Sequence, residues 1–234
     1  MAMLFVVGTP IGNLEDITLR ALRVLTEVDL ILCEDTRVTK KLLSRYEIRT
    51  PTLSYHARSG GAKVAKIAGL LEAGKNLALV SDAGTPTISD PGAALVSAVR
   101  ERLGSAVSIV AIPGPSALTA ALSVAGAPAS DVLFLGFLPH KKGRETLFRE
   151  IAESRRTVVF YESPHRIMKT LAALGRVAQG RGIALCRELT KLHEETLCGT
   201  AEELHEALVQ NPQKQRGECV IVVSALSPSA RRRA

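Results

Sequence analysis

Apolar and polar positions in the first half of the chain follow two alternating patterns. Short apolar runs, several rich in β-branched side chains, predict strands, and apolar positions spaced three or four apart predict helices between them. The predicted strands cover residues 4–7, 30–33, 52–55, 77–80 and 107–112. Strands that alternate with helices are typical of a mainly parallel sheet covered by helices.

The helices of this half are marked by their apolar faces and their ends. Residues 19–28 carry apolar side chains at a spacing of three, and Asp16 is placed to cap the start of that helix. Residues 64–71 form a second apolar face, and Gly74 is placed to end it in a left-handed conformation. A further helix is expected after Pro91.

The second half begins after residues 125–128, where small and chain-breaking residues predict a linker. Predicted strands follow at 132–138, 157–161, 183–187, near Thr196 and at 219–223, with helices at 144–154, 165–177 and near Leu204. We therefore expect an α/β protein with one α/β domain over residues 1–125 and a second over 126–226. Residues 227–234, which include three arginines, are expected to be a disordered basic tail.

The charge balance adds a candidate partner. The formal net charge is +7, which attracts anionic partners such as nucleic acid, although many proteins carry such an excess without one. Aromatic residues make up only 3% of the chain and Trp is absent, so a platform that grips a long single strand by its bases is hard to build. Any nucleic-acid contacts are expected to be mostly to phosphates.

Cysteine spacing and hydropathy narrow the class of protein. Cys33, Cys186, Cys198 and Cys219 are far apart and have no metal-ligand spacing, so we expect neither a disulfide framework nor a metal site. No apolar run approaches the roughly 20 residues that a membrane-spanning helix needs. We expect a cytoplasmic protein without a membrane partner.

The first loop, Gly8-Thr9-Pro10-Ile11-Gly12-Asn13, follows the first strand at the place where α/β proteins bind nucleotides. A dinucleotide fingerprint needs a second glycine where this chain has Pro10, which also lacks an N–H. Glu34 or Asp35, at the end of the second strand, could meet a ribose diol. The loop thus suits an adenosine ligand better than a diphosphate; the alternative is a tight turn with no ligand.

Residues 81–92, the sequence SDAGTPTISDPG, form the most unusual segment, and we call it the signature loop. It combines two Asp, two Gly, two Pro and several hydroxyl residues directly after a buried strand, which predicts a structured loop at a site. The segment Ile112-Pro113-Gly114-Pro115-Ser116-Ala117 follows the fifth strand in the same way. Three strand ends are therefore expected to converge on one cleft.

Together, GTPIGN, CEDTR, SDAGTPTISDPG, IPGPSA and YESPHR resemble, in order and spacing, the tetrapyrrole-methylase superfamily. Within it they resemble the family that methylates a cytidine 2′-hydroxyl in 16S ribosomal RNA of the small subunit. The resemblance covers essentially residues 3–224. It implies two α/β domains with a cofactor cleft between them, S-adenosylmethionine as cofactor, ribosomal RNA as partner, and a homodimer.

The resemblance also implies which residues bind the cofactor. Asp82 is included among them, although Asp82 and Asp90 are also placed to hold the shape of the signature loop. The chain departs from the family at residues 56–58, His-Ala-Arg in place of His-Asn-Glu, and it lacks the usual short C-terminal helical extension. The implied cofactor-binding residues are Pro10, Asp82, Ala83, Gly84, Thr85, Ile88, Ser116, Ala117, Tyr161, Glu162 and Leu189.

Methyl transfer to a ribose hydroxyl needs a base or a cation beside the oxygen, and Glu188 and Lys191 are the catalytic candidates. The alternative is that they form ion pairs that position loops. A precorrin-like tetrapyrrole, rich in carboxylates, is the alternative substrate, and a non-catalytic ribosome-binding protein is a third possibility. The substrate-binding candidates are Glu34, Asp35, Arg37, His140, Lys141, Lys142, Arg144 and Arg166.

Overall fold

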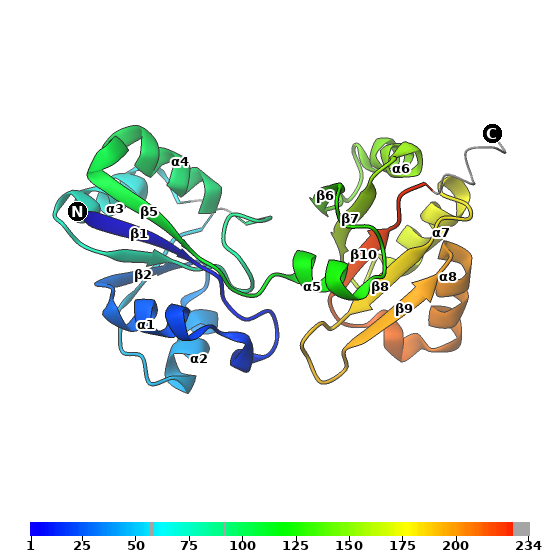
Figure 1. The fold of residues 1–234 in the computed structure, drawn as a ribbon, viewed down its shortest axis with the longest axis horizontal. Helices are drawn as coiled ribbons and strands as arrows, with labels where there is room; N and C mark the ends of the chain where they lie inside the picture. Colours follow the sequence, from blue (N-terminus) through cyan, green and yellow to red (C-terminus); the bar gives the residue numbers. More distant parts are fainter. Residues whose placement is uncertain (57–58, 91, 227–234) are drawn as a thin grey trace. The chain divides into compact units, whose positions relative to one another are not determined.

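The computed structural model describes residues 1–56, 59–90 and 92–226. The chain divides into two compact units, Met1–Ser116 and Ala117–Ala234, each built around its own five-stranded sheet (Figure 1). The α/β class expected from the sequence is confirmed. None of the helices in these described ranges is long and apolar enough to cross a membrane.

The sheet of the first unit is parallel throughout, with strand order β3-β2-β4-β1-β5. Its central strand, β4, is fully buried, and three of the four residues of the neighbouring β2 are buried, as expected for strands covered on both faces. Because all five strands run the same way, their carboxyl ends lie at one edge of the sheet. The strands are β1 (Ala2–Val7), β2 (Leu30–Cys33), β3 (Thr52–Ser54), β4 (Leu77–Leu79) and β5 (Val107–Ile112).

Helices cover both faces of this sheet (Figure 1). The helices α1 (Leu19–Glu27) and α2 (Thr36–Arg45) bury Val24, Leu25, Leu42 and Leu43 against one face. On the other face, α3 (Gly61–Glu72) and α4 (Gly92–Leu103) contribute Ile67, Leu71, Leu95 and Val99 to a second apolar cluster. A short 3-10 turn, η2 (Gly104–Ala106), leads from α4 into β5.

Helix ends in this unit differ partly from the prediction. The prediction that Asp16 caps α1 is wrong, because Thr18 is the cap and its hydroxyl accepts a hydrogen bond from the Ala21 N–H at 3.1 Å. Asp16 lies instead in the 3-10 turn η1 (Leu14–Asp16). The left-handed ending at Gly74 is confirmed, with φ +83° and a bond from its N–H to the Leu71 carbonyl.

The sheet of the second unit is mixed, with strand order β6-β7-β10-β8-β9. Only β6 and β7 pair in parallel; the other neighbours are antiparallel. The strands are β6 (Val132–Phe137), β7 (Thr157–Glu162), β8 (Ile183–Arg187), β9 (Glu195–Gly199) and β10 (Cys219–Val223). The helices α6 (Arg144–Glu153), α7 (Ile167–Val177) and α8 (Ala201–Gln210), followed by the turn η3 (Pro212–Gln215), build one core with this sheet.

The two units divide after Ser116, whereas the sequence placed the boundary after residue 125. The reason is the helix α5 (Ala117–Val124), which packs against β10 of the second sheet. The Cys186 thiol on β8 also donates a hydrogen bond to the main-chain carbonyl of the buried Ala121 in α5, at 3.9 Å. The predicted basic tail, residues 227–234, lies outside the described residues.

Candidate active site

The loops that follow β1 and β4 are joined at the carboxyl edge of the first sheet. The Thr9 N–H donates to the Gly84 carbonyl at 2.9 Å, and the Gly84 N–H donates back to the Thr9 carbonyl at 3.0 Å. The buried Thr9 hydroxyl donates to the Ser81 carbonyl at 3.2 Å. Thr9 therefore anchors the signature loop to the first loop.

The loop after β5 joins the same assembly through a glycine contact. A Cβ atom added to Gly8 would lie 2.9 Å from the Gly114 Cα, and one added to Gly114 would lie 2.8 Å from the Gly8 oxygen. Thr85 also donates its hydroxyl to the Pro115 carbonyl at 3.2 Å. The three strand ends that the sequence expected to meet are thus in contact.

Aspartates and unusual backbone angles hold the signature loop. Asp90 Oδ1 accepts hydrogen bonds from the N–H groups of Thr87 and Gly92 at 2.7 and 2.9 Å. Thr87 and Ser89 have φ angles of +77° and +64°, in the left-handed region that costs energy for residues with a side chain. Such strain persists only where the surroundings enforce it, and it is common at ligand sites.

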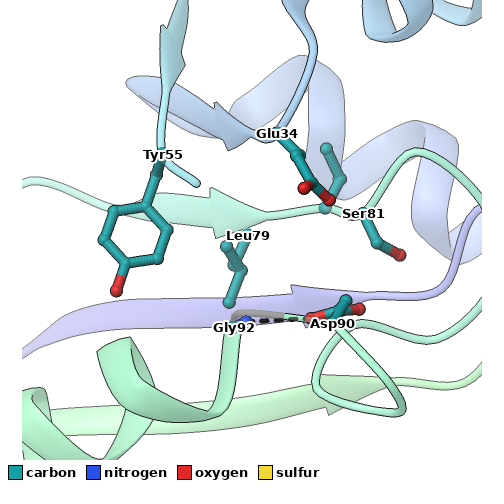
Figure 2. A pocket seen from close by; sticks show the side chains of 7 residues that line it. Glu34, Tyr55, Leu79, Ser81, Asp90 and Gly92 are labelled. Carbon is teal, nitrogen blue, oxygen red and sulfur yellow. Dashed lines mark hydrogen bonds between the residues drawn. The ribbon is translucent and has the colours of Figure 1, made fainter. Parts of the chain in front are cut away.

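A small pocket lies under this loop, lined by residues from three strand ends (Figure 2). Glu34 follows β2 and Tyr55 follows β3, while Ser81 and Asp90 belong to the signature loop. Burial raises the pKa of Glu34, and the negative charges of Asp82 and Asp90 raise it further, against the opposing effect of His56. The pKa of Glu34 is therefore above the ordinary value of a glutamate side chain, which favours its protonated form.

Asp35 has a different role from its neighbour Glu34. Its carboxylate caps α2 by accepting from the Arg37 N–H at 2.8 Å, and it pairs with the Arg37 guanidinium at 2.6 Å. The side-chain hydrogen bond from Arg37 is the main reason that the pKa of Asp35 falls to about 2. The Asp35 N–H donates to Asp82 at 3.0 Å, which ties the β2 end to the signature loop.

The charge of this edge fits a cationic ligand rather than a phosphate. The loops 8–13, 81–92 and 113–116 contain no Lys or Arg, and the signature loop contributes two aspartates. One of them, Asp90, keeps its Oδ2 buried without a hydrogen-bond partner among the described residues. A sulfonium cofactor carries positive charge at sulfur and no phosphate, so the side chains of this edge suit S-adenosylmethionine.

In the second unit, Glu162 lies at the centre of a buried ionic network. Its side chain is fully buried, and its two oxygens pair with Arg144 at 2.8 Å and Arg166 at 2.7 Å. Thr170 donates to the same carboxylate at 2.6 Å. Arg144 and Arg166, predicted to bind RNA phosphates, thus already have a carboxylate partner, and Glu162, predicted to bind the cofactor, has its oxygens engaged.

The catalytic candidates lie on a strained turn after β8. Glu188 and Thr190 have φ angles of +51° and +67°, on either side of the buried Leu189. Lys191 pairs with Glu188 at 3.0 Å and with Glu218 at 2.9 Å. Only a glycine fits at Gly217, because a Cβ there would lie 2.5 Å from the Glu188 side chain.

These contacts fix the charge of both catalytic candidates. Burial disfavours the charge of Lys191, but its hydrogen bonds to Glu218 and Glu188 outweigh burial and raise its pKa. Burial raises the pKa of Glu188, but the hydrogen bond from the Glu218 N–H and the Lys191 ammonium outweigh burial and lower that pKa overall. Lys191 is therefore held as a cation and Glu188 as a carboxylate at neutral pH.

A family model described as tetrapyrrole (corrin/porphyrin) methylases matches residues 3–205. The chain belongs to the tetrapyrrole methylases. The strand ends of the first unit, the signature loop and strands β6 to β9 fall inside the matched region, and β10 follows it.

Curated relatives of this tetrapyrrole methylase are named ribosomal RNA small subunit methyltransferase I. The protein from Thermotoga maritima is 45% identical over 96% of this chain and 99% of its own length. That from Pseudomonas aeruginosa is 44% identical over 94% of this chain and 78% of its own length. The resemblance found in the sequence motifs is confirmed by these matches.

Solved structures show the same fold. Cobalt precorrin-4 methyltransferase CbiF matches with a TM-score of 0.69 at 17% identity, over 95% of this chain and 94% of that one. The methyltransferase CobJ matches with a TM-score of 0.69 at 20% identity, over 96% and 95%. A uroporphyrin-III C-methyltransferase from Thermus thermophilus, complexed with S-adenosyl homocysteine, matches with a TM-score of 0.62 at 18% identity, over 96% and 97%.

The remaining predicted residues of this tetrapyrrole methylase differ in exposure. Pro10 and Gly84 are buried, Thr85 is half-buried, and Ala83 and Ile88 are exposed. Ser116 and Ala117 stand on either side of the division between the two units. His140, Lys141 and Lys142 are exposed on the segment between β6 and α6, and Tyr161 lies in an aromatic cluster on β7.

Several residues of the site were not predicted from the sequence. Thr9 anchors the signature loop, Tyr55 and Ser81 line the pocket, and Gly8 and Gly114 touch each other. The available signal for the last pair was a glycine close after each strand, since Gly8 follows β1 directly and Gly114 follows β5 after one proline. No comparable signal marked Tyr55, because the apolar pattern predicts it to be the last residue of a strand, whereas β3 ends at Ser54.

Proposed function

We propose that this chain transfers a methyl group from S-adenosylmethionine to the 2′-hydroxyl of a cytidine in 16S ribosomal RNA of the small subunit. One observation carries the proposal: the 45% identity to a ribosomal RNA small subunit methyltransferase I extends over 96% of this chain and therefore through both units. The methyl-transfer class also agrees with the family model that matches residues 3–205.

S-adenosylmethionine, when bound, supplies a methyl group already activated by its sulfonium. We propose that the joined loops of the first unit hold it through Pro10, Asp82, Ala83, Gly84, Thr85, Ile88 and Ser116, with Ala117, Tyr161, Glu162 and Leu189 contributing from the second. The strained but hydrogen-bonded signature loop supports this assignment, because a preorganised loop loses little entropy on binding. The acidic side chains of that edge support a cationic ligand.

Lys191 and Glu188 are proposed to act on the ribose hydroxyl. A hydroxyl is a weak nucleophile until its proton leaves, and a fixed cation stabilises the negative charge that then develops on oxygen. Lys191 is held as that cation by two carboxylates at 3.0 and 2.9 Å. Glu188 is proposed to position the ammonium and to receive the proton from the hydroxyl.

RNA phosphates are proposed to contact Arg37, His140, Lys141 and Lys142, whose side chains are exposed. Arg144 and Arg166 are proposed to position the His140–Lys142 segment rather than to bind phosphate, because their guanidiniums are paired with Glu162. Glu34 and Asp35 remain proposed substrate contacts. The protein is further proposed to act in the cytoplasm and to form a homodimer. Light scattering of the purified protein tests the homodimer.

The decisive experiment uses radiolabelled S-adenosylmethionine with small ribosomal subunits from cells that lack this activity. We expect label in one cytidine of 16S RNA, resistant to alkaline cleavage because the 2′-hydroxyl is blocked. Isolated 16S RNA in a parallel reaction shows whether the assembled subunit is required. Absence of label in RNA, together with an absorbance change on adding a precorrin-like tetrapyrrole, would replace the RNA substrate with the alternative one.

A further inference from the structure

Three of the eight aromatic residues of the chain meet at the outer strand of the second sheet. The rings of Phe134 and Phe137 on β6 each pack edge-to-face against Tyr161 on β7, with centroids 5.1 and 5.2 Å apart. Phe134 and Tyr161 are half-buried, whereas Phe137 is 60% exposed. Phe137 is thus held by Tyr161 with much of its ring in water, and covering that ring with a partner would be favourable.

A break in strand β6 produces this arrangement. In a regular strand Phe137 would share a face with Leu133 and Leu135, which pack against the core, and would point away from Phe134. The pairing of β6 with β7 shifts register between Phe134 and Phe137, where Gly136 has φ +61°. The bulge turns Phe137 out of the core face and brings it to Tyr161, as bulges near active sites commonly do.

The segment after Phe137 is basic and fixed in place. Arg166 donates to the Leu138 carbonyl at 3.0 Å, and Arg144 donates to the Pro139 carbonyl at 3.1 Å. Both guanidiniums are themselves held by the buried Glu162. The next residues, His140, Lys141 and Lys142, are exposed, and within the described ranges their side chains form no ion pair.

We infer that Phe137, the exposed member of the aromatic cluster Phe134–Phe137–Tyr161, stacks one unpaired RNA base, and that the segment 140–142 holds the phosphates of the same strand. The inference rests on the proposed function, which it deepens by assigning a subsite for single-stranded RNA. An aromatic face beside cations matches how proteins bind unpaired RNA, with bases stacked on rings and the backbone on positive charge. A purely apolar partner would leave the cations Lys141 and Lys142 at the edge of its interface.

Phe137→Trp tests the stacking directly, because the chain has no tryptophan and the variant has a single reporter. The matched control is Val209→Trp, at a position on α8 that is 54% exposed. We expect saturable fluorescence quenching of the first variant by a single-stranded cytidine-containing oligonucleotide, and much weaker quenching by the same oligonucleotide in a duplex. The control variant is expected to show no saturable quenching.

Phe137→Ala measures the contribution to affinity. Loss of one stacked base is expected to weaken binding of the single strand about tenfold, while the affinity for S-adenosyl homocysteine stays the same. The control variant Val209→Ala is expected to bind the single strand as the wild type does.

RNA binding by the Phe137→Trp variant without quenching would overturn the inference while leaving the proposed function intact. A concentration-dependent blue shift without RNA would assign the cluster to a second copy of the chain, and lost S-adenosyl homocysteine binding would assign it to the cofactor; either result overturns the stacking site. Failure of the wild-type protein to methylate RNA would instead count against the proposed function.

Discussion

Gly8 and Gly114 touch backbone to backbone, so that the ends of β1 and β5 approach as closely as main chains allow. A Cβ on Gly8 would lie 2.9 Å from the Gly114 Cα, a separation that real Cβ atoms essentially never show. The Gly8 N–H donates to the Ile112 carbonyl at 3.1 Å, which fixes the same approach. The neighbouring Thr9 then anchors the signature loop, so this contact sets the position of two loops.

Gly8→Ala is therefore expected to weaken cofactor binding more than it lowers the stability of the fold. The methyl group must push the loop after β5 away, at a cost of about 1–3 kcal/mol in stability, the usual range for overpacking. S-adenosyl homocysteine affinity, measured by calorimetry, is expected to fall at least tenfold because the joined loops separate. Unchanged affinity would show that the contact does not position the cofactor loops.

Gly69→Ala is the matched control for that substitution. Gly69 lies inside α3, and a Cβ added there would meet nothing within 4 Å. Alanine is favoured over glycine within helices, so we expect stabilisation by about 0.5–1 kcal/mol in thermal or urea unfolding. Cofactor affinity is expected to stay at the wild-type value.

Glu162→Gln tests the buried ionic network of the second unit. The substitution keeps the shape of the side chain but leaves Arg144 and Arg166 as half-buried cations without a counter-charge. Breaking such a pair costs about 3–5 kcal/mol, which urea unfolding measures. Asp131→Asn is the control, because it breaks an exposed ion pair in which Asp131 lies 4.0 Å from Arg156. It is expected to lower the free energy of unfolding by no more than about 1 kcal/mol. Equal effects of the two substitutions would contradict a stabilising role for Glu162.

Burial patterns explain which elements the sequence predicted well. The strands of the first unit were predicted to within one or two residues, because covered parallel strands are short continuous apolar runs. The helix α2 was missed, since only Thr39, Leu42 and Leu43 of its ten residues are buried and its apolar face is short. Residues 117–124, which form α5, were included in the predicted first domain, because nothing in their small apolar side chains shows which sheet they contact.

Chemistry at the sites was predictable only where it depended on local sequence. The signature loop was marked by its own composition, and its contacts with the first and fifth strand ends followed from parallel topology. The partners of Arg144 and Arg166 could not be predicted, because Glu162 meets them only through tertiary packing. The aromatic cluster was likewise unexpected, since a register shift at Gly136 reverses the face on which Phe137 lies.

Glu34 is expected to make stability fall as the pH rises. Burial, with the charges of Asp82 and Asp90, raises its pKa in the folded protein above the ordinary carboxyl value. The folded state then binds more protons than the unfolded state between the two pKa values, so unfolding free energy decreases with pH across that interval. Glu34→Gln removes the ionised group and is expected to raise stability at neutral pH relative to the wild type. The difference should vanish below the ordinary carboxyl pKa, and urea unfolding across this range measures it; a constant difference at all pH values would exclude ionisation as its cause.

Lys191→Met separates a catalytic cation from a structural ion pair. If the ammonium stabilises developing charge on the ribose oxygen, its loss is expected to lower kcat for RNA methylation about a hundredfold or more, with little change in KM. Lys191→Arg keeps the charge and is expected to recover part of kcat. Glu218→Gln removes one partner of Lys191 from an exposed position while Glu188 stays at 3.0 Å, so kcat should change less than tenfold. A purely structural Lys191 would give the opposite pattern, with a lower melting temperature for Lys191→Met and an unchanged kcat at temperatures where the variant is folded.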